Sequence, residues 1–169
     1  MNKKINIGII DYGINNIISV KNAFDLLECE TRVIYSNSEK YDFDALVLPG
    51  VGAFGEAIES LCNHGLNELI KENTIIKKKP FLGICLGMQL MANDSIEKGY
   101  NKGLSLIDGN VIKIKSSAEL RVPHIGWNNI EFKNESEIFK NIKNDSNFYF
   151  VHSYHFTCNN DYIIGKVNY

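Results

Sequence analysis

Short apolar runs alternate with amphipathic segments along the first 92 residues of the chain. The runs at 5–10, 31–35, 45–48 and 81–84 are rich in Ile, Val, Leu and Phe, as buried strands are. Apolar residues recur at helical spacing after Asn16 or Ser19, either of which can cap the helix, and again after Gly52. A third helix is expected over 86–92, and Gly65 should weaken the second. Strands that alternate with helices predict a parallel sheet covered on both faces.

The pattern changes after Gly99, where short strand-like pieces follow one another with turns between them. These pieces lie at 104–107, 111–114, 127–132, 148–151 and 162–167, and a short helical piece is expected at 137–142. They predict an antiparallel extension of the sheet. The expected fold is therefore α/β, with an open, mostly parallel sheet flanked by helices, in one domain over residues 1–169.

Composition and charge narrow the classes of function. With 169 residues, 44% of them hydrophobic and 22% charged, the chain suits one folded domain. A net charge of −2 gives no electrostatic excess for nucleic acid. No apolar run approaches the ~18 residues that span a bilayer, and no signal peptide is recognisable, so a cytoplasmic protein without membrane attachment is expected. Its four cysteines are expected to be free thiols.

The segment FLGICLGMQ at 81–89 carries the most chemical information. A buried strand runs through Gly83-x-Cys85-x-Gly87 into a helix, which is the arrangement of a nucleophile elbow with Cys in place of Ser. Small neighbours two residues away leave room for such a sharp turn. The turn places Cys85 at the start of a helix, where thiolate is favoured, and the N–H of Leu86 beside it is a candidate oxyanion donor.

A second glycine-containing loop, Pro49-Gly-Val-Gly52, follows a parallel strand and precedes a helix. It therefore belongs to the same edge of the sheet as Cys85. The amides of Val51 or Gly52 are candidates for the other half of an oxyanion hole.

Four segments together resemble the class I glutamine amidotransferases. They are LPGVGAF at 48–54, PFLGICLGMQL at 80–90, VPHIGWN at 122–128 and FYFVHSY at 148–154. Within that class they are most similar to the glutaminase subunits of imidazole glycerol phosphate synthase. The resemblance runs from Asp11 to the end of the chain, and it implies a flavodoxin-like fold.

The resemblance also implies a reaction and roles for individual residues. Cys85 would attack the side-chain amide of L-glutamine, releasing ammonia and leaving a thioester that water hydrolyses. Gln89 would help hold the substrate. The backbone at Gly52 and the stretch Ser153, Tyr154 and His155 would bind its amino and carboxylate groups. The ammonia would pass to a cyclase subunit with a (βα)₈ barrel, and Asn15, Asn16 and Trp127 would lie near that partner.

The chain departs from the family pattern at two places. The family usually has glycine where this chain has Asn15, a residue type that tolerates positive φ. The family also supplies a catalytic base in a His-Pro-Glu motif near the C-terminus, whereas none of the four histidines here is followed by x-Glu. The expectation is a chain that lacks its C-terminal segment and has impaired activity.

Several alternatives remain at the level of sequence. A paralogous glutaminase could supply ammonia for amidation of surface sugars, and a non-catalytic module could bind the partner only. A stand-alone cysteine hydrolase would act without a partner. His152 or His155 could serve as the base. His152, His155 and Cys158 have metal-ligand spacing, but three-residue steps on a strand point to opposite faces, so no metal site and no cofactor is predicted.

Overall fold

A four-stranded parallel sheet organises the first half of the chain in this computed structural model, which describes residues 4–38, 42–117, 120–133 and 136–169. Its strands are β1 (Asn6–Ile10), β2 (Glu30–Ile34), β3 (Ala45–Gly50) and β4 (Phe81–Cys85). They lie in the order β2-β1-β3-β4, and every neighbouring pair is parallel. The four apolar runs of the sequence are these four strands, so the predicted parallel sheet is confirmed.

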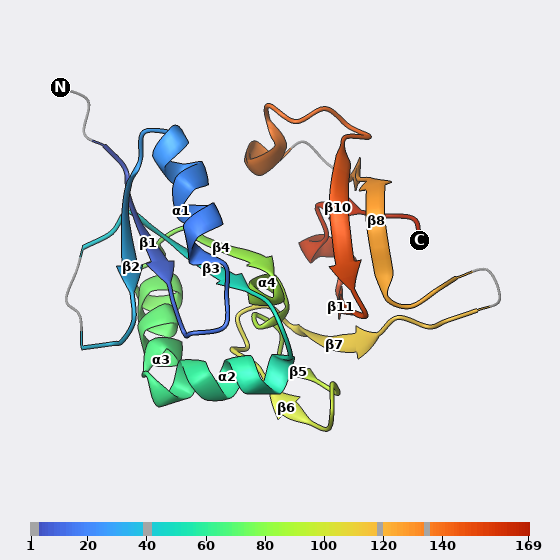
Figure 1. Ribbon diagram of the computed structural model, residues 1–169, viewed down its shortest axis with the longest axis horizontal. Helices are drawn as coiled ribbons and strands as arrows, with labels where there is room; N and C mark the ends of the chain where they lie inside the picture. The colour runs from blue at the N-terminus through green and yellow to red at the C-terminus, as the bar shows by residue number, and fades with distance from the viewer. Residues whose placement is uncertain (1–3, 39–41, 118–119, 134–135) are drawn as a thin grey trace.

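Helices cover both faces of this sheet because successive strand residues point to opposite sides. On one face, Ile7, Ile9 and Val47 form a cluster with apolar residues of α1 (Ile17–Leu26). On the other face, residues such as Leu46 and Leu48 pack in a larger cluster with α2 (Phe54–Asn63) and α3 (Leu66–Lys71). Figure 1 shows α1 on one side of the strands and α2 with α3 on the other.

Local sequence sets the ends of the helices. The side chain of Asn16 accepts a hydrogen bond from the Ser19 amide and so caps α1. Asn16 is one of the two residues predicted to cap this helix. Gly65 adopts φ 66° and separates α2 from α3, so it interrupts the expected second helix rather than weakening it. α4 covers only Leu86–Gln89, shorter than the predicted 86–92. A π-helical turn at Glu72–Ile76 follows α3.

The second half contains the predicted antiparallel strands, which form three further sheets. One contains β11 (Tyr154–Cys158), β7 (Gly109–Lys113), β5 (Asp94–Ser95) and β6 (Asn101–Lys102) in that order; within it, β5 and β7 are parallel. The second pairs β8 (His124–Asn129) with β10 (Asn147–His152), and the third pairs β9 (Glu131–Phe132) with β12 (Gly165–Lys166). Short 3₁₀ turns lie at Glu137–Phe139 and Asn160–Tyr162.

Three details of the second half differ from the sequence prediction. Its strands hydrogen-bond in sheets of their own rather than onto the edge of the parallel sheet. Residues 104–107 are not a strand; the amides of 104–107 instead donate to carbonyls of residues 90–92. β11 lies in a stretch for which no strand was predicted, and it forms because Tyr154–Cys158 pairs along the whole of β7.

The hydrophobic core is concentrated in the first two thirds of the chain. Among the described residues, the buried apolar side chains all fall between Ile7 and Val111, and after Val111 only His124 is buried. In Figure 1, the parallel sheet with its helices lies on one side and the β8–β10 ribbon on the other, with α4 and β7 between them. The second half is therefore a thin layer attached to a well-packed first half.

Candidate active site

Cys85 is held in a strained turn between a strand and a helix. It is the last residue of β4 and the residue that precedes α4, and it has φ 54° and ψ −116°. Residues other than Gly, Asn and Asp seldom adopt positive φ, and such conformations cluster at functional sites. The residue is exposed, although Leu86 and Gly87 directly after it are buried. The backbone thus presents the sulfur at the carboxyl edge of the sheet, as the sequence predicts.

The glycines on either side of Cys85 allow this turn to pack tightly. A Cβ placed on Gly83 would lie 2.6 Å from the backbone of Met88, and one on Gly87 would lie 1.8 Å from the Leu48 carbonyl oxygen. Both distances are far below van der Waals contact. α4 can therefore approach β3 and β4 this closely only with glycine at both positions, which gives the predicted spacing its physical basis.

Tyr12 lies beneath the turn and was not identified from the sequence. Its side chain is buried, and its hydroxyl, which has no hydrogen-bond partner, lies beside Gly50, the strand neighbour of Cys85. Burial raises the pKa of Tyr12 above its usual value, and the nearby negative charges of Cys85 and Asp11 raise it further. The phenol therefore stays neutral near Cys85.

The three predicted oxyanion donors differ in their surroundings. Leu86 is the first residue of α4, so its N–H has no acceptor within the helix. The Val51 N–H donates to the Ile14 carbonyl at 3.4 Å, a long hydrogen bond that directs it toward the loop before α1. Gly52 is exposed and has φ 90°, a conformation that suits glycine. Leu86 and Gly52 remain the better candidates in this conformation.

Gln89 connects α4 to the second half of the chain. Its side-chain amide donates to the Tyr154 carbonyl at 2.9 Å, across 65 residues of sequence. Of the predicted substrate-binding residues, the structure thereby brings together Gln89 and Tyr154. Ser153 is adjacent, where its carbonyl accepts from the Ile114 amide. His155 is half-buried in β11, opposite Ile112.

Three of the four histidines have ring contacts elsewhere than at Cys85. His64 lies 2.8 Å from the Ser60 carbonyl, at the end of α2. His124 Nδ1 and His152 Nε2 are 3.0 Å apart, and His152 Nδ1 lies 2.9 Å from the Tyr154 carbonyl. Both ring nitrogens of His152 are thus engaged, which argues against its use as the base. Burial and the neighbouring His152 lower the pKa of His124.

The residues predicted to face a partner lie in two places. The side chain of Asn15 donates to the Asp11 carboxylate at 3.2 Å. Asn15 does not have a positive φ, so the conformation that was expected to favour glycine at this position does not occur. Asn16 is exposed at the start of α1. Trp127 is 72% exposed and meets Tyr149 edge to face, with ring centroids 5.6 Å apart. Ile125 and Val151, also exposed, complete an apolar outer face on the β8–β10 ribbon.

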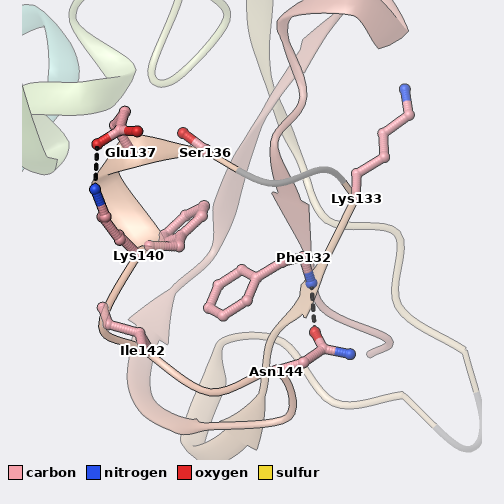
Figure 2. Close-up of a pocket in the computed structure, with 8 residues that line it drawn as sticks. Phe132, Lys133, Ser136, Glu137, Lys140, Ile142 and Asn144 are labelled. Atoms are coloured by element: carbon pink, nitrogen blue, oxygen red, sulfur yellow. Dashed lines mark hydrogen bonds and ion pairs between the residues drawn. The ribbon is translucent and has the colours of Figure 1, made fainter.

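Two further observations concern ligands. A cavity of about 740 Å³ lies near β9 and the 3₁₀ turn at Glu137–Phe139, where Lys140 pairs with Glu137 and Asn144 accepts from the Phe132 amide (Figure 2). None of the predicted site residues lines it. Within the described ranges, no three His, Cys, Asp or Glu side chains are grouped to hold a metal ion. No helix there is long and apolar enough to cross a membrane.

Comparison with known proteins identifies relatives along nearly the whole chain. Residues 8–165 match the family model "Glutamine amidotransferase class-I". The imidazole glycerol phosphate synthase subunit HisH 1 of Campylobacter jejuni is 39% identical over 163 residues, which are 96% of this chain and 81% of the relative. The HisH subunit of Methanocaldococcus jannaschii is 46% identical over 164 residues, covering 96% of this chain and 80% of its own.

Solved structures share the fold at low sequence identity. A crystal structure of a glutamine amidotransferase superposes with a TM-score of 0.73 at 14% identity, covering 95% of this chain and 79% of that one. The structure of PurLQS from Thermotoga maritima gives a TM-score of 0.68 at 16% identity, covering 98% and 75%. A glutamine amidotransferase from the same organism gives 0.66 at 19% identity, covering 93% and 64%.

Proposed function

Because this chain belongs to the class I glutamine amidotransferase family, we propose that it hydrolyses L-glutamine to glutamate and ammonia through a thioester on Cys85. The observation that carries the proposal is the turn at Cys85. A cysteine is held at positive φ, with its side chain exposed, between two glycines that no larger residue can replace. Strain of this kind is typical of a nucleophile that the fold holds in place.

In the proposed reaction, the Cys85 thiolate attacks the carboxamide carbon and a C–S bond forms. The carbonyl oxygen becomes negative, and the Leu86 amide, joined by that of Gly52 or Val51, donates hydrogen bonds to it. The C–N bond breaks, and the nitrogen takes up the proton that the Cys85 thiol released and leaves as ammonia. A water molecule then adds to the thioester carbon, the C–S bond breaks, and glutamate leaves while Cys85 is restored as a thiol. Gln89 and the backbone at Ser153, Tyr154 and His155 are proposed to hold the amino-acid end of the substrate.

The Val51 amide has a specific place in this proposal. Its N–H donates to Ile14 in this conformation, so the two-amide oxyanion hole requires either the Gly52 amide or a change at Val51. The bond to Ile14 is long, at 3.4 Å, and is therefore a weak one to break.

We also propose that the chain is the glutaminase subunit of an imidazole glycerol phosphate synthase, acting in histidine biosynthesis in the cytoplasm. The relatives at 39% and 46% identity are named as HisH subunits of imidazole glycerol phosphate synthase, which supports this proposal. The partner would be a cyclase subunit with a (βα)₈ barrel that receives the ammonia. The exposed outer face of the β8–β10 ribbon, with Trp127, Tyr149, Ile125 and Val151, supports a protein partner, because exposed apolar patches commonly mark interfaces.

We further propose that this chain alone turns over glutamine slowly. Attack by the Cys85 sulfur needs a general base to take the thiol proton, and the ring contacts of His64, His124 and His152 all lie elsewhere. Loss of a general base costs about 10²- to 10⁴-fold in rate. His155 is the remaining histidine.

Glutamate release from L-glutamine, followed with and without added imidazole and with and without the cyclase subunit, tests these statements. Imidazole can serve as an external base, so it is expected to raise the rate of this chain and not that of Cys85→Ala. The sensitivity to imidazole should persist in His155→Ala. A fast rate that imidazole leaves unchanged would show that a base lies within these residues. No release under any condition would contradict the proposed activity.

A further inference from the structure

A pair of histidines from the β8–β10 ribbon contacts the same carbonyl that Gln89 contacts. His152 Nδ1 lies 2.9 Å from the Tyr154 oxygen, and Gln89 Nε2 lies 2.9 Å from that oxygen. His152 Nε2 in turn lies 3.0 Å from His124 Nδ1. A continuous series of polar contacts therefore runs from the ribbon to α4, the helix that begins directly after Cys85.

The chemistry of the acceptor fixes the protons in this series. A carbonyl oxygen can only accept, so Nδ1 of His152 must carry a hydrogen. In the neutral ring, Nε2 is then an acceptor, and His124 Nδ1 must donate to it. His124 thereby selects the tautomer of His152 that bonds to Tyr154. The arrangement resembles the way in which outer residues orient metal-ligating histidines through their second ring nitrogen.

His124 is itself firmly held. It is the one buried residue of the described chain after Val111. Its ring stacks on Tyr169 at 3.7 Å and on Phe150 at 4.8 Å between centroids. A buried polar ring needs a hydrogen-bond partner, and His152 supplies it. The pair is therefore a fixed support rather than a mobile surface contact.

We infer that His152 is a positioning residue, which holds the Tyr154 carbonyl and, through it, the side chain of Gln89 in the orientation that accepts glutamine. His124 acts one step further out by fixing the tautomer of His152. The inference rests on the proposed function and assigns these two histidines a role in substrate orientation, not in proton transfer at Cys85.

Two electrophiles separate orientation from reactivity. A glutamine analogue with a diazoketone in place of the amide must be held by the substrate site before it alkylates Cys85. Iodoacetamide needs only an accessible thiolate. The rate of Cys85 labelling is measured with each reagent by mass spectrometry of the peptide that contains Cys85, on the full chain and its variants, because Cys62 is also exposed. The ratio of the two rates reports how well the site orients a glutamine-shaped molecule.

His152→Phe keeps a ring but removes both nitrogens, and it is expected to lower the diazoketone rate about 10- to 100-fold, as small misplacements of a bound group do. The iodoacetamide rate should stay within about twofold of the unmodified chain. His152→Asn places an amide donor where Nδ1 lies, so it should recover most of the diazoketone rate. The control is His64→Phe, because His64 is exposed at the C-terminal end of α2 and its ring hydrogen-bonds to the Ser60 carbonyl; it should change neither rate.

His124→Phe covers the case in which His152→Phe does not fold. It leaves the Tyr154 contact in place but removes the partner that selects the tautomer, so a smaller loss, about 3- to 10-fold, is expected. Equal diazoketone rates in His152→Phe, His124→Phe and the unmodified chain would overturn the inference and leave the proposed function standing. An unmodified chain that reacts with iodoacetamide but not with the diazoketone would overturn the proposed function, and this inference with it.

Discussion

The two halves of the molecule are built for different tasks. In the first, a parallel sheet is packed on both faces and its core side chains are almost fully buried. In the second, short antiparallel ribbons contribute mostly half-buried and exposed side chains. Cys85, the proposed nucleophile, belongs to the first half, whereas the carbonyl that Gln89 contacts and the exposed aromatic face belong to the second. A strained turn needs rigid packing beneath it, whereas contacts with substrate and partner can be made by a thin layer of strands.

The largest effect on activity is expected at Cys85, in the first half of the molecule. Cys85→Ala should lower glutaminase activity by about 10⁴-fold or more, because no thioester can form. The fold should survive, since the residue is exposed. Glutamate release and a urea unfolding curve measure the two properties. Cys62→Ala, which removes another exposed cysteine, is the control and should leave both unchanged. Activity retained in Cys85→Ala would remove the basis of the comparison.

Glycines from the two halves should differ in their cost of substitution. Gly87→Ala forces a Cβ against the Leu48 carbonyl oxygen, so the free energy of unfolding should fall by about 3 kcal/mol. Gly126→Ala, in β8, meets nothing within 4 Å, and only its φ of 143° opposes the change; about 1 kcal/mol is expected. Urea unfolding monitored by circular dichroism measures both. Equal losses would mean that the turn at Cys85 is more pliable than its packing indicates.

An exposed aromatic residue of the second half should affect binding without affecting folding. Trp127→Ala is expected to weaken the affinity for the cyclase subunit about 10-fold or more, the usual range for a buried interface tryptophan. The free energy of unfolding should change by less than about 0.5 kcal/mol. Tyr100→Ala, exposed to a similar degree but outside the β8–β10 ribbon, is the matched control. Isothermal titration with the cyclase distinguishes them, and equal affinities for the two variants would contradict the proposed interface.

The smallest effect concerns pH and His124, the one buried residue after Val111 in the part of the chain that the structure describes. Burial and His152 lower the pKa of His124, so the unfolded chain binds a proton more readily than the folded one. By linkage, stability from this residue is complete above the ordinary histidine pKa and decreases as the pH falls below it. Unfolding curves are recorded for the unmodified chain and for His124→Phe at pH 7.5 and 5.5. The free energy of unfolding should fall more between these two pH values in the unmodified chain than in His124→Phe. Identical pH dependence would contradict this assignment.

Local signals in the sequence were sufficient to predict the turn at Cys85, which is the central feature of the site. Gly83, Cys85 and Gly87 lie within five residues, so the steric requirement that joins them can be recognised without knowing the fold. The four buried strands could be predicted for the same reason, since each is a short apolar run with a turn after it. The cap of α1 could be narrowed to Asn16 or Ser19 because capping acts over three residues, and the structure shows that it is Asn16.

Features that depend on distant partners could not be predicted in this way. The second-half strands form sheets of their own because their partners lie far away in sequence, as Asn147–His152 pairs with His124–Asn129. β11 has no strong strand pattern and is defined by β7. The Tyr12 hydroxyl and the His124–His152 contact were missed as site features because each depends on the packing of segments that the sequence keeps apart.

Position 85 is a place where folding and chemistry favour different amino acids. The backbone angles there resemble the first central residue of a type II′ turn, which favours glycine and mirror-image residues. Selection for folding alone would therefore discard the cysteine. Under the proposed function, its presence is a stability–activity trade-off, and chains of this fold that have no such catalytic role should drift toward glycine at this position.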